Sequence, residues 1–275
     1  MTPRKIVDRL TAAAMPLYGS AEARQIAFMI LEARTGIDIT KFVTQPDVQV
    51  VIDDLEHMAD EIGRGRPVQY VLGGAEFCGM KFEVGEGVLI PRPETEELVR
   101  RIVDSRPASL LDIGTGSGCI AISVAALSPE TEVWATDISA KALEYARRNA
   151  ANAGTKITFM QDDALSGTDA GRQFDAVVSN PPYIPRSEAA GMRINVVDYE
   201  PHTALFVDDD DPLVFYRAIA RSARRLLTEG GRLWFEIHER FADEVVRLIE
   251  NEGFVGVEYF DDINGKPRIV CGRKA

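Results

Sequence analysis

Cysteine, histidine and tryptophan are scarce in this chain, which has three, three and two of them among 275 residues. The cysteines are Cys78, Cys119 and Cys271, which are far apart and odd in number, so a disulfide framework is not expected. The histidines show no metal-ligand spacing with one another or with the cysteines. We therefore expect no metal site.

Positive charge is also in short supply. Lysine and arginine number 31 against 43 aspartates and glutamates, which gives a formal net charge of −12. Such a chain repels nucleic acid unless it has a local basic patch. The densest basic runs, Arg147-Arg148 and Arg224-Arg225, fall on predicted helices and read as solvated faces. We expect no direct binding of nucleic acid.

Long hydrophobic runs are missing as well. No apolar stretch has the length of a membrane span, and the first residues lack the pattern of a signal peptide. The hydrophobic fraction of 45% and the charged fraction of 27% are those of an ordinary soluble protein. We therefore expect a cytoplasmic protein without membrane association, long enough for two domains.

Residues 1–72 are expected to form a small helical bundle. Apolar residues recur at helical spacing in three segments, around Leu10, Ile30 and Met58. The first helix is expected to end before Pro16, because proline disrupts a helix interior. The three apolar stripes are sufficient for a core of their own.

Residues 73–95 are expected to form a β-hairpin that links the bundle to a second domain. Phe82 and Val84 alternate with charged residues, as in a strand with one buried face. The glycines within 85–87 predict the turn, and the apolar residues 88–90 predict the second strand.

Strand and helix patterns alternate from residue 96 to residue 275, which is typical of an α/β domain with a doubly wound sheet. The last two predicted strands are too close in sequence for a crossover helix, so an antiparallel hairpin through Asn264-Gly265 is expected. The seven predicted strands span residues 110–113, 133–136, 157–160, 176–179, 233–237, 255–260 and 268–271.

The most informative stretch is Asn180-Pro181-Pro182-Tyr183, which follows the apolar strand pattern of 174–179. Open α/β sheets bind ligands at the carboxyl ends of their strands. Two prolines make this loop stiff and poor in donors. The Asn180 oxygen and the Pro181 carbonyl can accept both hydrogens of a planar –NH2 group, whose face the Tyr183 ring covers. The alternative is an ordinary proline-rich turn.

A glycine-rich loop follows the first strand of the α/β region. A dinucleotide-binding fingerprint would need its last glycine at position 119, where the chain has Cys119. The spacing G-x-G-x-G instead resembles the cofactor loop of Rossmann-like methyltransferases that use S-adenosylmethionine. The loop consists of Gly114, Thr115, Gly116, Ser117 and Gly118.

Acidic residues lie near the carboxyl ends of the first three strands of this region. Asp137 ends the second strand, where it can accept hydrogen bonds from both ribose hydroxyls or cap the helix after Ser139. Asp162 and Asp163 end the third strand, where such methyltransferases hold the adenine amino group, although either residue also suits a turn. Asp112 is placed to meet the amino-acid end of the cofactor or to stabilise the turn.

With both loops in this order, the chain resembles the bacterial PrmC/HemK family, the peptide chain release factor N5-glutamine methyltransferases. The resemblance spans nearly the whole chain and implies a class I S-adenosylmethionine-dependent methyltransferase fold at 96–275. Its further motifs lie at 65–73, 90–96, 199–206 and 264–268. It implies cofactor contacts from Asp112, Gly114, Thr115, Gly116, Ser117, Gly118, Asp137, Asp163, Ala164 and Asn180, and substrate contacts from Asn180, Pro181, Pro182 and Tyr183, with Asn180, Pro181 and Tyr183 catalytic.

The implied reaction transfers a methyl group from S-adenosyl-L-methionine to the side-chain amide nitrogen of a glutamine, leaving S-adenosyl-L-homocysteine. The implied substrate is the Gly-Gly-Gln loop of peptide chain release factors, bound with the help of the bundle at 1–72, and we expect a monomer. Two positions depart from the family pattern. Ala164 stands where an aromatic residue near adenine is usual, and His238 stands where glycine usually follows Glu236-Ile237.

Three other functions compete with this one. A glutamine methyltransferase of a ribosomal protein would share the catalytic domain and differ in the bundle. DNA adenine-N6 methyltransferases use a similar Asn-Pro-Pro-Tyr loop, but they grip phosphates, which an acidic chain disfavours. A noncatalytic cofactor-binding partner of the translation machinery would have no use for the loop at 180–183.

Overall fold

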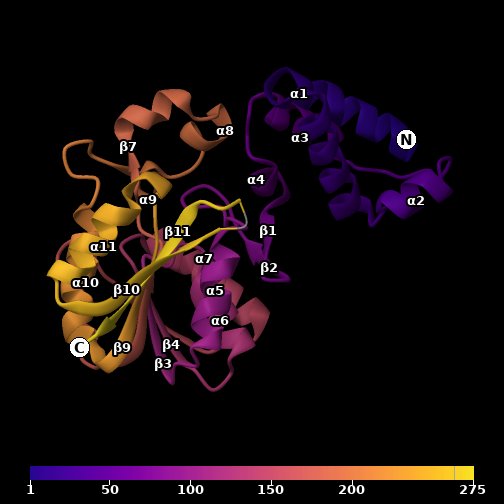
Figure 1. The fold of residues 1–275 in the computed structure, drawn as a ribbon. Coiled ribbons are helices and arrows are strands. Elements are labelled where there is room, and N and C mark those ends of the chain that lie inside the picture. Colours follow the sequence, from indigo (N-terminus) through magenta and orange to yellow (C-terminus); the bar gives the residue numbers. More distant parts are fainter. Residues whose placement is uncertain (263) are drawn as a thin grey trace. The chain divides into compact units, whose positions relative to one another are not determined.

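The computed structural model describes residues 1–262 and 264–275 (Figure 1). The chain divides into two compact units. One consists of Met1–Gly74 together with Arg193–Tyr199, and the other of Ala75–Met192 together with Glu200–Ala275.

The first unit is a helical bundle with a core of its own. Ile6, Leu10 and Ile30 are buried together with Met58 and Ile62, so the apolar stripes seen in the sequence do face one another. The helices are α1 (Pro3–Thr35), α2 (Ile39–Thr44), α3 (Leu55–Gly63), α4 (Val68–Leu72) and α8 (Ile194–Val197).

The break in the long helix α1 lies at Gly19, so the expected end before Pro16 is wrong. The helix continues through Pro16, and the chain leaves helical geometry only at Gly19, with φ 71° and ψ 172°. A proline inside a helix removes one hydrogen bond but does not have to end the helix at once. Glycine adopts the positive φ without the steric cost of a Cβ atom, so the interruption falls there.

The segment Arg193–Tyr199 belongs to the helical unit, although its sequence lies within the range expected for the methyltransferase domain. The Arg193 guanidinium forms an ion pair with Glu22 at 2.5 Å. The Tyr199 hydroxyl donates a hydrogen bond to the Arg64 carbonyl oxygen at 3.0 Å. These partners are more than a hundred residues away in the chain, and no local pattern marks them.

A β-hairpin does occur within 73–95, but its turn lies earlier than expected. Strands β1 (Gly74–Phe77) and β2 (Met80–Glu83) are joined by Cys78 and Gly79, with φ of 49° and 72°. Two successive positive φ values are typical of the tight turns that suit the twist of a hairpin. The segment 88–90 forms no strand. Val88 and Ile90 are buried and Leu89 is partly buried, so the apolar run at 88–90 reflected burial and not strand pairing.

The second unit contains the seven-stranded sheet that the sequence predicted. The strands are β3 (Ser109–Ile113), β4 (Glu132–Asp137), β5 (Ile157–Gln161), β6 (Phe174–Ser179), β9 (Leu227–Glu236), β10 (Phe254–Asp261) and β11 (Pro267–Lys274). Their order is β10-β11-β9-β6-β3-β4-β5. The strands β5, β4, β3, β6 and β9 are parallel, and β11 pairs antiparallel with both β9 and β10, which confirms the C-terminal hairpin.

The sheet reverses its winding between β3 and β6. The chain proceeds from β3 outward through β4 to β5, then returns to β6 on the other side of β3. The gap between two such strands at their carboxyl ends is where open α/β sheets bind ligands.

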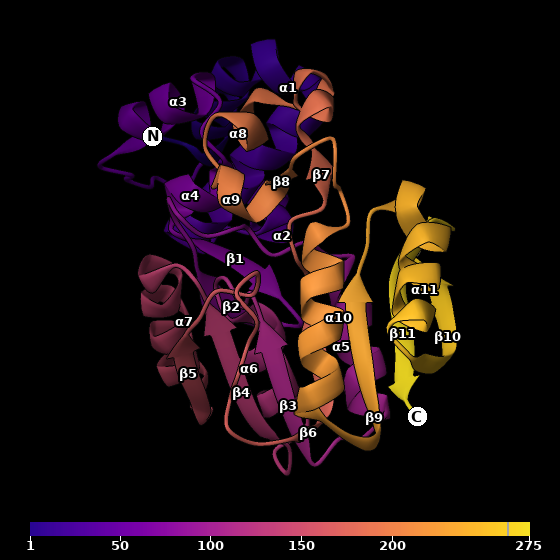
Figure 2. The ribbon, with the colours of Figure 1, turned by 90° about the vertical axis from the view of Figure 1, so that its left-hand side faces the viewer.

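Helices cover both faces of the sheet (Figure 2). One face carries α5 (Thr95–Asp104), α6 (Cys119–Leu127) and α7 (Ala140–Ala153), and the other carries α10 (Val214–Leu226) and α11 (Ala242–Asn251). Short elements complete the unit: β7 (Ile184–Pro185) pairs with β8 (Phe206–Val207), and α9 (His202–Leu205) and the 3-10 helices η1 (Arg186–Gly191) and η2 (Glu239–Phe241) lie in the connections.

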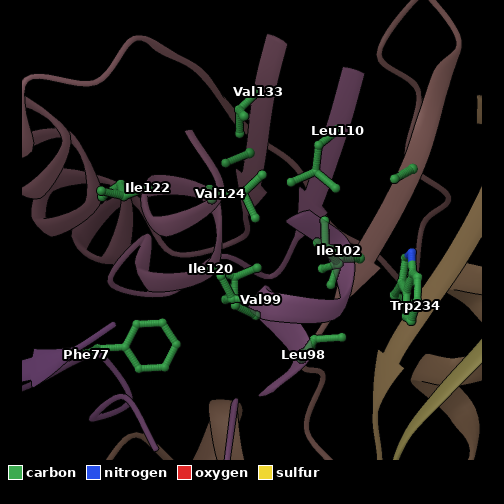
Figure 3. Close-up of a cluster of buried hydrophobic side chains, with 14 of the residues drawn as sticks. Phe77, Leu98, Val99, Ile102, Leu110, Ile120, Ile122, Val124, Val133 and Trp234 are labelled. Atoms are coloured by element: carbon green, nitrogen blue, oxygen red, sulfur yellow. The ribbon is translucent and has the colours of Figure 1, made fainter. Parts of the chain in front are cut away.

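One of the two cores of this unit lies between the sheet and the helices α5 and α6 (Figure 3). Leu110 and Val133 extend from the sheet toward Ile102, Ile120 and Val124. All five residues of β3 are buried. A central parallel strand is covered on both faces, so Leu110, Leu111 and Ile113 are all buried without alternation. Its two polar residues are held by hydrogen bonds, Ser109 with Asp175 and Asp112 with Thr115.

Gly118 is expected to be essential for packing at the start of α6. It has φ 83°, and a Cβ atom there would lie 2.7 Å from Ile122 Cδ1 and 3.2 Å from Ala146 Cβ. Gly118→Ala therefore combines an unfavourable φ with overpacking, and we expect a loss of about 2–4 kcal/mol in the free energy of unfolding. Gly154→Ala is the matched control, because Gly154 has φ 67° and nothing within 4 Å of the added atom. Denaturant unfolding of both variants checks this, and equal losses would contradict it.

Candidate active site

A cavity of about 420 Å³ opens at the carboxyl ends of the strands beside the point where the winding reverses. Its lining includes the glycine-rich loop after β3, the end of β4, the loop after β5 and the loop after β6. The segments 87–92 and 201–206 contribute further walls. Chain segments that are far apart in sequence therefore meet around one space large enough for a small ligand.

Ten of the thirteen residues expected at the site line this cavity. They are Gly114, Thr115, Gly116, Ser117, Asp137, Asp163, Ala164, Asn180, Pro181 and Pro182. The other three, Asp112, Gly118 and Tyr183, are not among the lining residues in the part of the chain that the structure describes. Gly118 packs against Ala146 of α7. Asp112 and Tyr183 make hydrogen bonds that hold the glycine-rich loop and the Asn-Pro-Pro-Tyr loop in place.

Asp112 stabilises the glycine-rich loop through a hydrogen bond with Thr115. Its side chain is fully buried, and Oδ2 accepts a hydrogen bond from the Thr115 hydroxyl at 2.6 Å. Within residues 1–262 and 264–275, its Oδ1 atom has no hydrogen-bond partner. Burial raises the pKa of Asp112 to about 7. The amides of Gly114 and Thr115 both donate to the Thr136 carbonyl oxygen, at 2.9 and 2.8 Å, which ties the loop to β4 as well.

Asp137 connects the glycine-rich loop to the start of α7. Its Oδ2 atom accepts a hydrogen bond from the Gly116 amide, and its Oδ1 atom accepts one from the Ser139 amide, both at 2.8 Å. The helix itself is capped by the Ser139 hydroxyl, which accepts from the Ala142 amide at 3.1 Å. Burial raises the pKa of Asp137, and the backbone amides oppose that effect. Each carboxylate oxygen has a second lone pair, so Asp137 can still accept from a ligand.

Asp162 and Asp163 differ in how much of their hydrogen-bonding capacity is used. Asp163 accepts from the Leu165 amide at 2.9 Å and from the Ser166 hydroxyl at 2.8 Å. Asp162 Oδ2 is buried and has no partner among the described residues. Both residues line the cavity. The Asp162 carboxylate accepts no hydrogen bond from the described residues, so it keeps more acceptor capacity for a ligand than Asp163 does.

Asn149 on α7 is a supporting residue that the sequence interpretation did not identify. Its Nδ2 atom donates to the Ser117 carbonyl oxygen at 2.9 Å and to the Glu83 carbonyl oxygen at 3.1 Å. Its Oδ1 atom accepts from the Glu83 amide at 2.7 Å. The signal was present, because Asn149 follows Leu143 and Ala146 on the buried stripe of α7, where a polar residue needs partners.

The loop after β6 presents Asn180 to the cavity. Strand pairing continues up to Ser179, opposite Phe235, and the Ser179 hydroxyl donates to the Ile113 carbonyl oxygen at 2.6 Å. Asn180 comes next and is half-buried. Across the described part of the chain, its carboxamide makes no hydrogen bond to another residue. It therefore keeps its full capacity for a ligand.

Tyr183 ends this loop and faces away from the cavity lining. Its hydroxyl donates a hydrogen bond to Glu236 Oε1 at 3.2 Å. Its ring makes an edge contact with the His238 ring, with the centroids 5.9 Å apart. In this structure Tyr183 anchors the loop through these two contacts, and its packing on a ligand amide stays a prediction.

Arg92 and Glu200 join two of the sequence motifs beside the cavity. The buried carboxylate of Glu200 accepts from Arg92 Nη2 at 2.6 Å and from the Ile90 amide at 3.1 Å. Arg92 and the next residue after Glu200, Pro201, both line the cavity. This ion pair therefore positions one wall of the site.

The sequence of the chain matches that of known methyltransferases over most of its length. Residues 92–196 match the family model of the methyltransferase small domain. The chain is 41% identical to the release factor glutamine methyltransferase of Bacteroides thetaiotaomicron, over 98% of this chain and 100% of that protein. It is 35% identical to that of Geobacter sulfurreducens, over 99% of this chain and 96% of that one.

The chain belongs to the release factor glutamine methyltransferase family. This confirms the resemblance seen in the sequence, and solved structures confirm the fold. A methyltransferase from Pyrococcus furiosus superposes with a TM-score of 0.53 at 18% identity, over 72% of this chain and 90% of that chain. The 16S rRNA N2 G1207 methyltransferase of T. thermophilus, solved with AdoMet and guanosine, gives 0.52 at 15% identity, over 74% and 50%.

Among residues 1–262 and 264–275, no helix is both long and apolar enough to cross a membrane. In the same residues, no three histidine, cysteine or acidic side chains are grouped so that they can hold a metal ion.

The buried carboxyl of Asp112 predicts a pH-dependent stability. Folding raises its pKa from 3.8 to about 7, so the folded state binds this proton more tightly. Its contribution is complete below the unfolded pKa and is lost as the pH rises through about 7. Asp112→Asn has no titrating carboxyl at this position, so we expect wild-type stability to fall relative to the variant between about pH 4 and pH 7, by about 1.4 kcal/mol for each pKa unit of the shift. Urea unfolding at several pH values measures the difference, and parallel curves would contradict the assignment.

Proposed function

We propose that this protein transfers a methyl group from S-adenosylmethionine to the side-chain amide nitrogen (N5) of the glutamine in the Gly-Gly-Gln motif of peptide chain release factors. Family membership supports the substrate class, because the curated relatives are named release factor glutamine methyltransferases. The observation that carries the chemistry is the unpaired carboxamide of Asn180 at the cavity.

The residues around the cavity fit S-adenosylmethionine. Asp137 has spare acceptor capacity at the end of β4 for ribose hydroxyls. Asp162 lines the cavity, and its carboxylate accepts no hydrogen bond from the described residues, so it can accept from an amino group such as that of adenine. The glycine-rich loop allows close backbone approach to the amino-acid end. When bound, S-adenosylmethionine supplies a methyl group already activated by its sulfonium.

Ala164 leaves the adenine position without the aromatic residue that is usual in the family. Two large apolar side chains line the cavity nearby and are exposed, Ile138 by 60% and Leu165 by 47%. Exposed apolar side chains beside a cavity lose contact with water when they cover a flat ligand, and this burial stabilises the bound state. We assign the covering of adenine to Ile138 and Leu165.

The role of the protein is to orient a poor nucleophile. The lone pair of an amide nitrogen is shared with its carbonyl, so the nitrogen attacks only when its geometry favours it. If the Asn180 oxygen and the Pro181 carbonyl accept both N–H groups of the glutamine, the face of the nitrogen is held toward the methyl donor. These hydrogen bonds strengthen as positive charge develops on nitrogen, so they stabilise the transition state more than the ground state.

No strong base is required for this reaction. The nitrogen becomes far more acidic once it is alkylated, and its proton can then leave to water. The prolines keep the loop rigid, and positioning of this kind can contribute about 7–11 kcal/mol to catalysis. The buried carboxylates of Asp112 and Glu236 are already held by hydroxyl groups of the protein.

We also propose that the helical unit binds the release factor and that the protein acts as a monomer. The unit has its own hydrophobic core, so it can present a surface without disturbing the sheet. A ribosomal protein substrate remains the competing candidate because it would use the same cavity. The net charge of −12 argues against DNA.

Replacing Asn180 is expected to abolish the orientation of the substrate glutamine amide and to leave the cofactor site in place. Asn180→Ala should lower methyl transfer to a purified release factor by about 10²–10³-fold, as does the loss of one preorganised polar group elsewhere. Transfer of radiolabelled methyl measures the rate, and calorimetry measures S-adenosylmethionine binding. Asn251→Ala, an exposed asparagine at the end of α11, is the control. An active Asn180→Ala enzyme would refute the assigned role.

Replacing Asp137 is expected to weaken the binding of S-adenosylmethionine. Asp137→Ala removes a charge-assisted acceptor, so the loss should be about 1.5–3 kcal/mol. Titration calorimetry compares it with Asp243→Ala, an exposed acid on α11. Unchanged affinity of Asp137→Ala would mean that this residue only connects the loop to α7.

A further inference from the structure

Glu236 is a buried carboxylate that neither methyl transfer nor cofactor binding explains. It ends β9 with a relative exposure of 1%. The Thr95 hydroxyl donates to its Oε2 atom at 2.5 Å, and the Tyr183 hydroxyl donates to its Oε1 atom at 3.2 Å. The two donors come from different elements. Thr95 is the first residue of α5, and Tyr183 is the last residue of the Asn-Pro-Pro-Tyr loop.

The loop has few other restraints. Pro181 and Pro182 have no amide hydrogen to donate. Pairing of β6 with β9 ends at Ser179, and pairing resumes at Ile184 in the short strand β7. In the chain as described, the Tyr183 hydroxyl makes the one side-chain hydrogen bond of residues 180–183.

Burying a carboxylate at this position costs free energy, because its charge is removed from water. Its neighbours in sequence, Phe235 and Ile237, are both buried in the apolar core. Burial raises the pKa of Glu236, and the Thr95 hydroxyl, the Arg268 guanidinium and the Tyr183 hydroxyl oppose that effect. A buried ion adds little to stability compared with an apolar residue, but it does require its donors to be in place. The Thr95 and Tyr183 hydroxyls must therefore both stay within hydrogen-bond distance of the Glu236 carboxylate.

We propose that Glu236 is a positioning residue that holds Tyr183, and through it Asn180, in the geometry needed for methyl transfer. Thr95 fixes the carboxylate, and the carboxylate fixes the end of the loop. The Tyr216 hydroxyl also donates to the Glu236 carbonyl oxygen at 3.2 Å, so the backbone that carries the carboxylate is restrained too. The effect on catalysis rests on the proposed function, whereas the effect on the loop does not.

Hydrogen exchange on the full-length protein without substrate tests the effect on the loop directly. Glu236→Gln keeps the size of the side chain, and Tyr183→Phe removes only the hydroxyl. Both variants should exchange the amides of Asn180, Tyr183, Ile184, Arg186 and Ser187 about tenfold faster or more, because the loop opens locally. Asp175→Asn is the matched control, since Asp175 accepts from Ser109 at the other end of β6. Its loop should exchange at the wild-type rate. Unchanged exchange in both loop variants would overturn the proposal.

Kinetics tests the consequence for methyl transfer. Each of the two variants should lower kcat by about 10–100-fold, the scale of a small misplacement of a reacting group, with little change in KM for S-adenosylmethionine. The double variant should be no slower than the slower single variant, because both remove the same contact. Multiplied effects would overturn the proposal. If wild-type enzyme methylates no release factor, the proposed function fails, while the exchange result still decides the role of Glu236.

Discussion

The parallel pairing of β3 with β6 is the constraint on which the site depends. It places Asp112 opposite Val178, so that the glycine-rich loop and the Asn-Pro-Pro-Tyr loop leave the sheet side by side. The Ser179 hydroxyl, bonded to the Ile113 carbonyl oxygen, extends this registration by one residue beyond the ladder. In the proposed reaction, a cofactor held by one loop and an amide held by the other therefore meet without any large movement of the backbone.

Buried carboxylates carry much of the organisation around this pairing. Burial raises the pKa of Asp112, Asp137 and Glu236, and each is held by hydroxyl or amide donors from neighbouring loops and helices. Buried ions of this kind cost stability and give conformational specificity only when their donors are in place. In the proposed function, these carboxylates hold the loops whose position decides the rate of methyl transfer.

The sequence predicted the parts of this arrangement that follow from short-range chemistry. The seven strands and the two loops had periodic or glycine and proline patterns, and ten site residues expected from them line the cavity. Long-range partners had no such signal. The bonds of Glu236 to Thr95 and of Glu200 to Arg92 join residues more than a hundred positions apart. A single carboxylate in an apolar stretch shows only that some partner exists.

The errors of the sequence interpretation have the same origin. The hairpin turn was expected at 85–87, because buried residues at 88–90 resemble a strand, although their burial comes from packing and not from pairing. The break of α1 was expected at Pro16 and lies at Gly19, where the backbone takes a positive φ. Which unit takes in Arg193–Tyr199 depends on Glu22 and Arg64, which lie far away in the chain.

Tandem mass spectrometry of a purified release factor, incubated with this protein and S-adenosylmethionine, tests the central claim most directly. The expected result is a single methyl group on the side-chain nitrogen of the glutamine in the Gly-Gly-Gln motif. An unmodified glutamine, with S-adenosylmethionine still bound by the protein, would contradict it and would direct the search to ribosomal proteins.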